Sequence, residues 1–367
     1  MSWLAKTFAL LALLTLGACD DSYRWNLPEK FPRPPVPADN PMTPAKVALG
    51  RALFYDTRLS VNGAMSCGSC HRQELAFTDG KPVAVGTTGE RHRLGAMSLV
   101  NVAYNPRLTW ANPLVGSLEH QALVPMFSEK PVEMGLAGRE HELLANLRDD
   151  KAMRKMFTDA FPGDGEPVTL DHITKAIASF ERTILSANSP FDRYMRGDEK
   201  ALSPEALRGL DLFFSERLEC FHCHGGFNFT DSSRHGAQDA MALPYHHTGL
   251  YDWDGKGGYQ PGNNGVYDIT GDPRDIGRFR APTLRNIAVT APYMHDGSVE
   301  TLDNVLTHYA AGGRFRSKLT SEFLPGFILT KTEKADVIAF LNALTDETVL
   351  KDPALSDPHS PAAVRAP

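Results

Sequence analysis

Apolar positions recur at helical spacing in this chain and predict a mainly helical fold. Two segments, 169–186 and 332–344, place apolar side chains three or four positions apart, on one face of a helix. They are Ile173, Ile177, Phe180 and Ile184 in the first segment and Val337, Phe340, Leu341 and Leu344 in the second. Residues 225–280 are rich in Gly, Asp and Pro and predict a long loop region. No segment shows the alternation typical of a half-buried strand.

A ten-residue segment occurs twice, which predicts two similar lobes. Residues 50–59 (GRALFYDTRL) align without gaps on 209–218 (GLDLFFSERL), at an offset of 209 − 50 = 159. Each copy follows a helix start, Thr43-Pro44 or Ser203-Pro204, in which a capping hydroxyl precedes a proline at the first helical position. Each copy also precedes a Cys-x-x-Cys-His motif. We therefore interpret the chain as a duplicated unit.

Length and charge narrow the classes of protein. The chain has 367 residues, a length typical of about two domains. Its composition, with 42% apolar residues, excludes a disordered, fibrous or multi-span membrane protein. Its formal charge of 38 − 44 = −6 argues against a nucleic-acid partner.

The N-terminus has the features of a bacterial export signal, which predicts a periplasmic protein. Residues 1–18 combine a positive Lys6 with an apolar run too short to span a bilayer. The sequence Leu16-Gly-Ala-Cys19 resembles a lipobox, in which Cys19 becomes the lipidated first residue of the mature protein. The alternative is cleavage after Ala18, which leaves a free thiol, but Leu16 fits poorly the small residue wanted there. Lipidation would be the protein's sole membrane attachment.

The remaining boundaries follow from composition and from the repeat. Residues 19–42 are the predicted anchor and linker, and residues 28–41 within them contain six prolines, typical of an extended spacer. We expect an N-terminal lobe over 43–190, a C-terminal lobe over 191–350 and a loose tail over 351–367.

Both repeats carry the attachment motif of c-type haem. The motifs are Cys67-Gly-Ser-Cys70-His71 and Cys220-Phe-His-Cys223-His224. In such motifs the two thiols form thioethers to one haem, and the histidine ligates its iron. A zinc site would pool ligands from both motifs, and disulfides would leave the paired histidines unexplained. The motifs therefore predict two covalent haems, with His222 merely exposed or packed.

Four blocks resemble the bacterial di-haem cytochrome c peroxidase and MauG superfamily over residues 43–344. They are 49–56 (LGRALFYD), 117–126 (SLEHQALVPM), 131–135 (PVEMG) and 282–297 (PTLRNIAVTAPYMHDG). Residues 96–104 and 108–112 resemble the MbnH group, the di-haem enzymes associated with methanobactin operons. The resemblance implies two cytochrome c-like lobes with one haem each.

One position separates the superfamily's two branches, and here it holds a tyrosine. In the peroxidases, a methionine fourteen residues after the histidine of the His-x-Gly block ligates the C-terminal haem. In this chain 295 + 14 gives Tyr309, the pattern of MauG and MbnH, which implies His224/Tyr309 ligation. A phenolate is a hard anion that favours Fe(III), whereas a thioether favours Fe(II). The alternative is that Tyr309 only packs on its helix while Met294 or His308 ligates.

The resemblance also implies a peroxide site at the N-terminal haem. Gln121 matches the distal glutamine, Pro125 the proline that keeps the sixth iron position open, and Glu133 the acid-base carboxylate. Glu133 lies two residues further from Gln121 than in the family. The alternatives are a solvated helix face for Gln121 and a surface turn for Glu133. His92 is one residue out of place for the histidine that occupies the iron in resting peroxidases, so we expect a nearby polar residue.

Two further features of the family fall between the lobes. Trp110 matches the aromatic residue that relays electrons or holes between the haems, with a core tryptophan as the alternative. Asn101, Thr290 and the carbonyl of Pro292 match a calcium site, and oxygen ligands suit Ca²⁺.

Together these features imply an enzyme that uses hydrogen peroxide. In MauG and MbnH, peroxide drives the haems to a bis-Fe(IV) state, which oxidises a residue on a partner protein, a Trp for MbnH-like enzymes. The alternative is a cytochrome c peroxidase that reduces peroxide to water with electrons from a small redox protein. A third hypothesis is an electron carrier with both irons six-coordinate.

Overall fold

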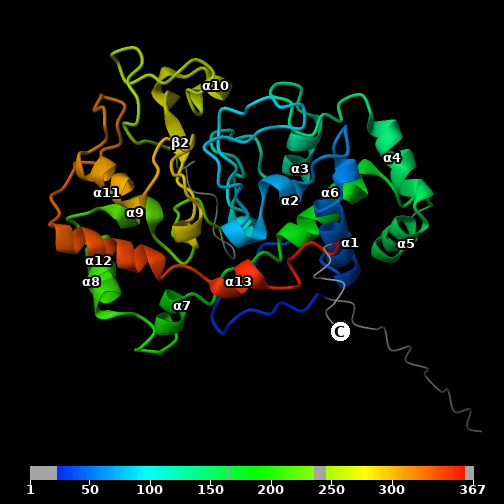
Figure 1. Ribbon diagram of the computed structural model, residues 1–367, viewed down its shortest axis with the longest axis horizontal. Helices are drawn as coiled ribbons and strands as arrows, with labels where there is room; N and C mark the ends of the chain where they lie inside the picture. Colours follow the sequence, from blue (N-terminus) through cyan, green and yellow to red (C-terminus); the bar gives the residue numbers. More distant parts are fainter. Residues whose placement is uncertain (1–22, 164, 235–244, 360–367) are drawn as a thin grey trace, which may run out of the picture.

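Two helical lobes lie side by side in the protein (Figure 1). The computed structural model describes residues 23–163, 165–234 and 245–359. The first lobe contains α1 (Pro44–Phe54), α2 (Cys67–Cys70), α3 (Leu118–Phe127), α4 (Glu140–Asp149), α5 (Lys151–Ala160) and α6 (Leu170–Glu181). The second contains α7 (Pro190–Met195), α8 (Pro204–Phe213), α9 (Cys220–His224), α10 (Tyr267–Thr270), α11 (Leu302–Ala310) and α12 (Lys331–Asn342), and α13 (Glu347–Lys351) follows. The predicted mainly helical fold is confirmed.

Short elements complete the fold. The 3-10 helices are η1 (Thr57–Leu59), η2 (Gln73–Leu75), η3 (Val102–Tyr104), η4 (Pro273–Asp275) and η5 (Ile287–Val289). Strands β1 (Tyr245–His247) and β2 (Arg278–Arg280) pair antiparallel, with Tyr245 opposite Arg280. They lie in the region 225–280, which is otherwise mostly loop as predicted. Strands of three residues are too short for an alternating pattern to reveal them.

The predicted helices form where their capping residues place them. The hydroxyl of Thr43 accepts a hydrogen bond from the backbone N–H of Lys46 at the start of α1, and Ser203 caps α8 in the same way. Thr169 and Thr330 cap α6 and α12, the helices expected over 169–186 and 332–344. Each side-chain cap satisfies a backbone donor that the first helical turn leaves unpaired.

The repeat is visible in how the helices of each lobe cross. A Cβ on Gly50 of α1 would lie 1.8 Å from the carbonyl oxygen of Ala176 in α6. A Cβ on Gly209 of α8 would lie 1.9 Å from the carbonyl oxygen of Asp336 in α12. The partner positions are 336 − 176 = 160 residues apart, one more than the glycines. The same backbone-to-backbone crossing therefore occurs in both lobes.

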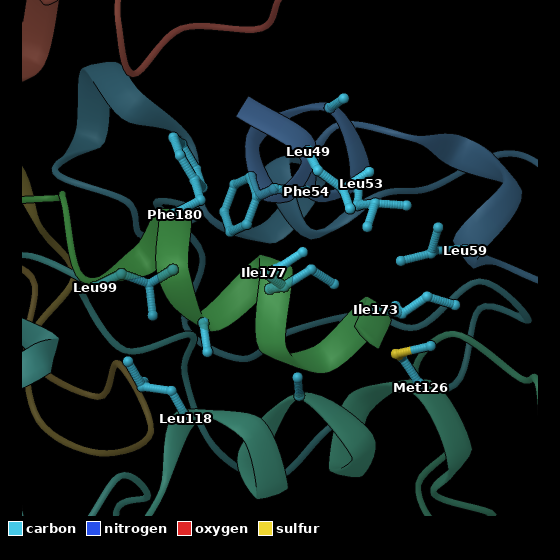
Figure 2. Packing of buried hydrophobic residues seen from close by; sticks show 14 of the residues in the cluster. Leu49, Leu53, Phe54, Leu59, Leu99, Leu118, Met126, Ile173, Ile177 and Phe180 are labelled. Carbon is cyan, nitrogen blue, oxygen red and sulfur yellow. The ribbon is translucent and has the colours of Figure 1, made fainter. Parts of the chain in front are cut away.

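Each lobe has its own hydrophobic core around this crossing. In the first lobe, α6 packs against α1 on one side and α3 on the other, and Figure 2 shows the side chains that meet at both contacts. The fully buried members include Leu49, Leu53, Phe54, Ile173 and Phe180. The second core gathers Phe213, Phe229, Leu306, Val337, Phe340 and Leu344. Burial of such large apolar side chains is the main favourable contribution to folding.

Buried polar side chains join the lobes. Asn101 and Asn286 both have a left-handed backbone, with φ of 56° and 59°. The backbone N–H of Ser186 donates to the Oδ1 of Asn101 at 2.9 Å, and its hydroxyl donates to the Oδ1 of Asn286 at 2.8 Å. The carboxylate of Asp346 accepts the backbone N–H groups of residues 187–188. Since these groups are buried and paired, separating the lobes would leave them without partners.

The proline-rich segment is packed on the folded body where it is described. The hydroxyl of Tyr104 donates to the carbonyl of Pro32 at 2.5 Å, and the ring of Phe31 packs edge-on against Tyr104. The amide of Asn40, which is fully buried, donates to Glu119 at 2.7 Å. The segment is extended, as expected, but it lies along the lobes rather than apart from them.

Residues 351–359, the described part of the loose tail expected over 351–367, pack on the first lobe instead, and residues 360–367 lie outside the described residues. Val349, Leu350 and Leu355 are buried in the core of the first lobe. The guanidinium of Arg51 donates to the carbonyl oxygens of Pro353 and Ser356, both at 2.7 Å. The apolar residues at the end of the chain account for the difference, because they gain stability by burial. Figure 1 shows α13 running beneath the lobes toward α1.

The export signal over 1–18 and Cys19 lie outside the described residues, so both stay predictions. Within the described part of the chain, none of the helices combines the length and the apolar character that a bilayer crossing demands.

We predict that Gly50→Ala destabilises the first lobe. The new methyl group would overlap the Ala176 carbonyl, and relieving such overlap costs about 1–3 kcal/mol or more. That corresponds to a drop in melting temperature of roughly 2–4 °C per kcal/mol for a lobe of this size. Thermal unfolding followed by circular dichroism measures it. Gly165→Ala is the control, because nothing lies within 4 Å of its Cβ position, and equal melting temperatures would refute the steric argument.

Candidate active site

The first Cys-x-x-Cys-His motif presents a fixed histidine to a cavity. Cys67 and Cys70 lie one turn apart on α2, which Ser66 and Ser69 cap reciprocally. His71 follows, and its Nδ1 donates to the carbonyl of Phe77 at 2.8 Å. A carbonyl can only accept, so the proton sits on Nδ1 and Nε2 is left to bind a metal. Burial lowers the pKa of His71, which keeps the imidazole neutral as a ligand must be.

The second motif repeats this arrangement. Cys220 and Cys223 lie on α9, and the Nδ1 of His224 donates to the carbonyl of Phe229 at 3.1 Å. Burial also lowers the pKa of His224. All four motif cysteines have free thiols, which argues against disulfides, and the two motifs line separate cavities, which argues against one shared zinc site. His222 packs against Phe323 and pairs with Glu219, so it is packed as expected.

The cavity of the first lobe collects the residues expected at a peroxide site. It is bordered by α2, α3, α6 and the segments that follow α2 and α3. The predicted residues that line it are Cys67, Cys70, His71, His92, Gln121, Pro125 and Glu133. A haem held by the thiols and His71 would therefore share the cavity with the expected acid-base group.

Backbone contacts bring Glu133 to the cavity despite its two extra residues. Gln121 and Pro125 are four residues apart on α3 and so lie on the same face. The carbonyl of Pro125 accepts the backbone N–H of Met134 at 2.9 Å, which ties the segment after α3 to that helix. The extra residues are absorbed in the turn between, where Glu129 and Val132 form an isolated bridge. Glu133 is thus not confined to a surface turn.

Glu133 lies beside His92. The Nε2 of His92 is 3.6 Å from a carboxylate oxygen of Glu133, and its Nδ1 accepts the backbone N–H of Leu94 at 3.1 Å. The Nε2 therefore carries the proton and points at the carboxylate. Burial raises the pKa of Glu133 and lowers that of His92. His92 is therefore a polar neighbour of Glu133.

Sequence reasoning missed a second carboxyl group, that of Glu181 at the end of α6. Its side chain lines the first cavity, is 5% exposed, and has an Oε2 atom without a hydrogen-bond partner. Burial raises its pKa to about 8, so it is protonated at neutral pH. The equivalent residue of the second lobe, at 181 + 160, is Leu341, which lines the second cavity. The sequence contained one indication of this group: Glu181 lies four residues after Ile177 and so falls on the apolar face of the predicted helix.

The second cavity brings Tyr309 to the same space as His224. This cavity has a volume of about 1350 Å³ and is lined largely by apolar side chains. Tyr309, on α11, lines it, whereas His308 is turned away and its Nε2 donates to the carbonyl of Thr248 at 3.0 Å. Met294 also lines the cavity. Of the two alternative ligands, only Met294 shares the cavity with Tyr309.

The apolar setting favours a neutral phenol at Tyr309 when no cation is near. Burial raises the pKa of Tyr309 above its ordinary value. A phenolate here therefore needs a neighbouring positive charge, which an iron held by His224 would supply.

Trp110 lies between the second cavity and a cavity at the lobe interface, and it lines both. Its indole N–H donates to the carbonyl of Gly95 at 2.9 Å, and its own carbonyl accepts the N–H of Arg280. Trp110 does not line the first cavity.

The expected calcium ligands are not all at one cavity. Thr290 and Pro292 line the interface cavity, but Asn101 does not. Asn101 is fully buried, and its amide donates to Ser186 and Asn228 while its Oδ1 accepts from Ser186. Its hydrogen bonds explain its presence without a metal, so calcium stays a prediction.

Two lobes that each present two thiols and an oriented imidazole to a cavity define a di-haem c-type cytochrome. The sequence model of the family described as di-haem cytochrome c peroxidase matches residues 44–200. The chain is 37% identical to the cytochrome-c peroxidase IdrP1 of Denitromonas iodatirespirans, covering 91% of each chain. It is 33% identical to the methylamine utilization protein MauG of Methylophilus methylotrophus, covering 91% of this chain and 94% of that one. The protein belongs to the di-haem cytochrome c peroxidase family, with two haem cofactors, and is an oxidoreductase that acts on peroxide.

A solved structure agrees over nearly the whole chain. It is the crystal structure of a MauG-like protein associated with microbial copper homeostasis, which is 47% identical to this chain. The match has a TM-score of 0.89 and covers 92% of this chain and all of that one.

We predict that the reaction with peroxide depends on pH through Glu133. Its carboxylate form accepts a proton, and because its pKa is raised, that form appears at higher pH than for an ordinary glutamate. The rate should therefore rise with pH through the raised pKa. Glu133→Gln should abolish this rise and slow the reaction by about 10²–10⁴-fold.

Stopped-flow absorbance of the haems after mixing with peroxide measures the effect. Glu129→Gln is the control, because Glu129 is exposed in the same turn and lies outside the cavity. A Glu133→Gln enzyme that keeps the pH profile of the unmodified protein would exclude Glu133 as the acid-base group.

Proposed function

We propose that this protein uses hydrogen peroxide to oxidise a residue, a Trp by its resemblance to the MbnH group, on a partner protein. The observation that carries the proposal is Tyr309 in the cavity of His224. Tyrosine is the residue of the MauG-like branch at this position. The 47% identity to a MauG-like protein, against 37% to a cytochrome-c peroxidase, also supports this branch.

In the first cavity, the chain's own residues would move the protons of peroxide. The carboxylate of Glu133 takes a proton from one peroxide oxygen and returns it to the other, which leaves as water when the O–O bond breaks. The amide of Gln121 can donate a hydrogen bond to the oxygen on which charge develops. Pro125 brings no ligating atom to the cavity. The two haems, when bound, take up the two oxidising equivalents that bond cleavage releases.

In the second lobe, the ligand set would determine where the oxidising equivalents reside. A phenolate oxygen from Tyr309 stabilises the more oxidised states of iron relative to a thioether. Trp110, which lines the second cavity and the cavity at the lobe interface, would relay electrons between the two sites. The partner's residue would then lose two electrons to the protein.

The cellular setting is part of the proposal. The export signal over 1–18 and the lipobox at Cys19 support a periplasmic protein held to a membrane by a lipid anchor. Covalent haem attachment, which takes place outside the cytoplasm, agrees with this setting. A calcium ion at Asn101, Thr290 and Pro292 remains part of the proposal on resemblance alone.

The test is to add peroxide to the purified di-haem protein together with candidate periplasmic proteins. Mass spectrometry should find an oxidised Trp in a partner only when both peroxide and the di-haem protein are present. Rapid peroxide consumption with no modified residue in any partner, but with oxidation of a small redox protein, would favour the peroxidase alternative instead.

We predict that Tyr309→Met makes the second haem easier to reduce. Replacing a hard phenolate by a thioether should raise the reduction potential by on the order of 0.1 V, within the roughly 0.8 V span that axial ligands set. Potentiometric titration of the haem spectrum measures this shift. Met294→Leu is the matched control, because Met294 lines the same cavity. A shift in Met294→Leu without one in Tyr309→Met would identify Met294 as the ligand, and a readily reduced second haem in the unmodified protein would support the peroxidase alternative.

The electron-carrier alternative makes a different spectroscopic prediction. A carrier with both irons six-coordinate gives no high-spin ferric signal in electron paramagnetic resonance and no reaction with peroxide. We expect a high-spin ferric signal from the haem of the first lobe, because Pro125 leaves its sixth position open. The polar groups of the first cavity argue against a carrier, which has no use for them.

A further inference from the structure

The segment between α11 and α12 exposes several large apolar side chains. We call residues 314–331 the 314–331 loop, which ends with Lys331, the first residue of α12. Phe315 is 47% exposed, Phe323 38% and Ile328 87%. These are three of the nine large apolar side chains that are exposed in the described part of the chain. Exposed apolar surface that is concentrated in one segment marks an interaction site more often than singly scattered apolar residues do.

The same loop carries a net positive charge, although the carboxylates of Glu216 and Glu219 lie close to His222, on which Phe323 stacks. Its four cations are Arg314, Arg316, Lys318 and Lys331, all of them exposed. None of the four forms an ion pair with the described residues. With Glu322 as the loop's one acidic residue, the net charge is 4 − 1 = +3, whereas the whole chain carries −6. An anionic contact surface is therefore attracted to this part of the protein in particular.

The loop also forms part of the wall of the second cavity. Phe323, Leu324 and Phe327 line that cavity. The ring of Phe323 stacks on His222, inside the Cys-x-x-Cys-His motif, with centroids 4.6 Å apart and an angle of 21°. Phe323 thus reaches from the cavity wall to the surface. Figure 1 shows the loop at the outer edge of the second lobe, on the side away from the first lobe.

Backbone hydrogen bonds hold the loop in place. The N–H of Phe315 donates to Gly249 at 2.9 Å, and the N–H of Phe327 donates to Ala310 at 3.0 Å. The guanidinium of Arg316 donates to the carbonyl of Pro325 at 3.0 Å, which joins the two halves of the loop. A surface held in this way binds without first having to become ordered, and this lowers the entropic cost of association.

We propose that the 314–331 loop is the docking surface for the partner protein, which presents acidic residues around an apolar contact. This inference rests on the proposed function, because it assigns the place where the partner's residue comes close to the second haem. The loop contains no amphipathic helix of the kind that lies on membranes. Its apolar residues border the haem cavity instead, where electron transfer to a protein needs close approach.

The test uses two reduced probe proteins, an acidic plastocyanin and a basic cytochrome c, with the complete di-haem protein and peroxide. The acidic probe should be oxidised faster, and its rate should fall steeply with ionic strength. The double variant Lys318→Glu/Lys331→Glu should lower the rate for the acidic probe by about tenfold at low salt and raise that for the basic probe. The control Lys151→Glu/Lys200→Glu makes the same change of charge at exposed lysines elsewhere and should do neither.

A second variant tests the apolar contact. Ile328→Ser should raise the KM for the acidic probe by about fivefold, as expected when a buried apolar side chain is lost from an interface. Its effect should persist at high salt, unlike that of the charge variants. The spectral change that peroxide causes without any probe should stay the same in every variant, because none of these residues lines either haem cavity.

The outcomes separate this inference from the proposed function. If the unmodified protein does not react with peroxide, the proposed function fails. If it reacts, but Lys318→Glu/Lys331→Glu oxidises each probe at the same rate as the control Lys151→Glu/Lys200→Glu, the docking surface is refuted. Binding to anionic lipid vesicles that is lost in Lys318→Glu/Lys331→Glu, with unchanged oxidation of both probes, would assign the loop to a membrane and also overturn the proposal.

Discussion

The close crossing of two helices in each lobe is the contact on which the rest of the structure depends. Gly50 lets α1 touch the backbone of α6, and Gly209 lets α8 touch the backbone of α12. At either position a Cβ atom would overlap a carbonyl oxygen of the facing helix. The crossing brings one face of α6 or α12 to the haem cavity of its lobe, with Ile177 in the first lobe and Val337 in the second. The motif histidines are then fixed by backbone carbonyls, so that both lobes offer an imidazole in the same tautomer. The helix crossing and the fixed motif histidine therefore occur in the same form in both lobes.

What differs between the lobes is the polarity of the cavities. The first contains Gln121, Glu133 and Glu181, groups that hold or move protons. The second has Leu341 where the first has Glu181, and it is lined largely by apolar side chains around Tyr309. Proton transfer is needed where the O–O bond breaks, whereas a site that only stores and passes electrons benefits from an apolar, water-poor setting. In the proposed function, the different roles of the two lobes therefore follow from a few substitutions on one repeated frame.

Several features could not be predicted from the sequence for identifiable reasons. The strands β1 and β2 are three residues long, too short for a pattern. The packing of Leu355 on the first lobe depends on a surface formed by residues some 300 positions earlier, and a short apolar segment does not indicate its partner. Asn101 matched a calcium ligand by motif, but its side-chain hydrogen bonds are made with Ser186 and Asn228, which no local spacing connects to it. The sequence shows Glu181 as a charged residue on an otherwise apolar helix face. Only the structure shows that its side chain lines the first cavity.

The sequence by itself predicted the helix starts and the two haem motifs, because each depends on residue types a few positions apart, and it showed the repeat as a match between two segments. Tyr309 was assigned by resemblance to the MauG-like branch. Hydrogen-bonding caps, thioether attachment and helical periodicity act over a few residues and so can be read locally. Only the tertiary structure decided that Glu133 reaches the cavity despite its extra residues, and that it lies beside His92. The tertiary structure alone also placed the charged 314–331 loop on the wall of the second cavity. These are contacts between segments far apart in the chain, and the packing of the whole molecule determines them.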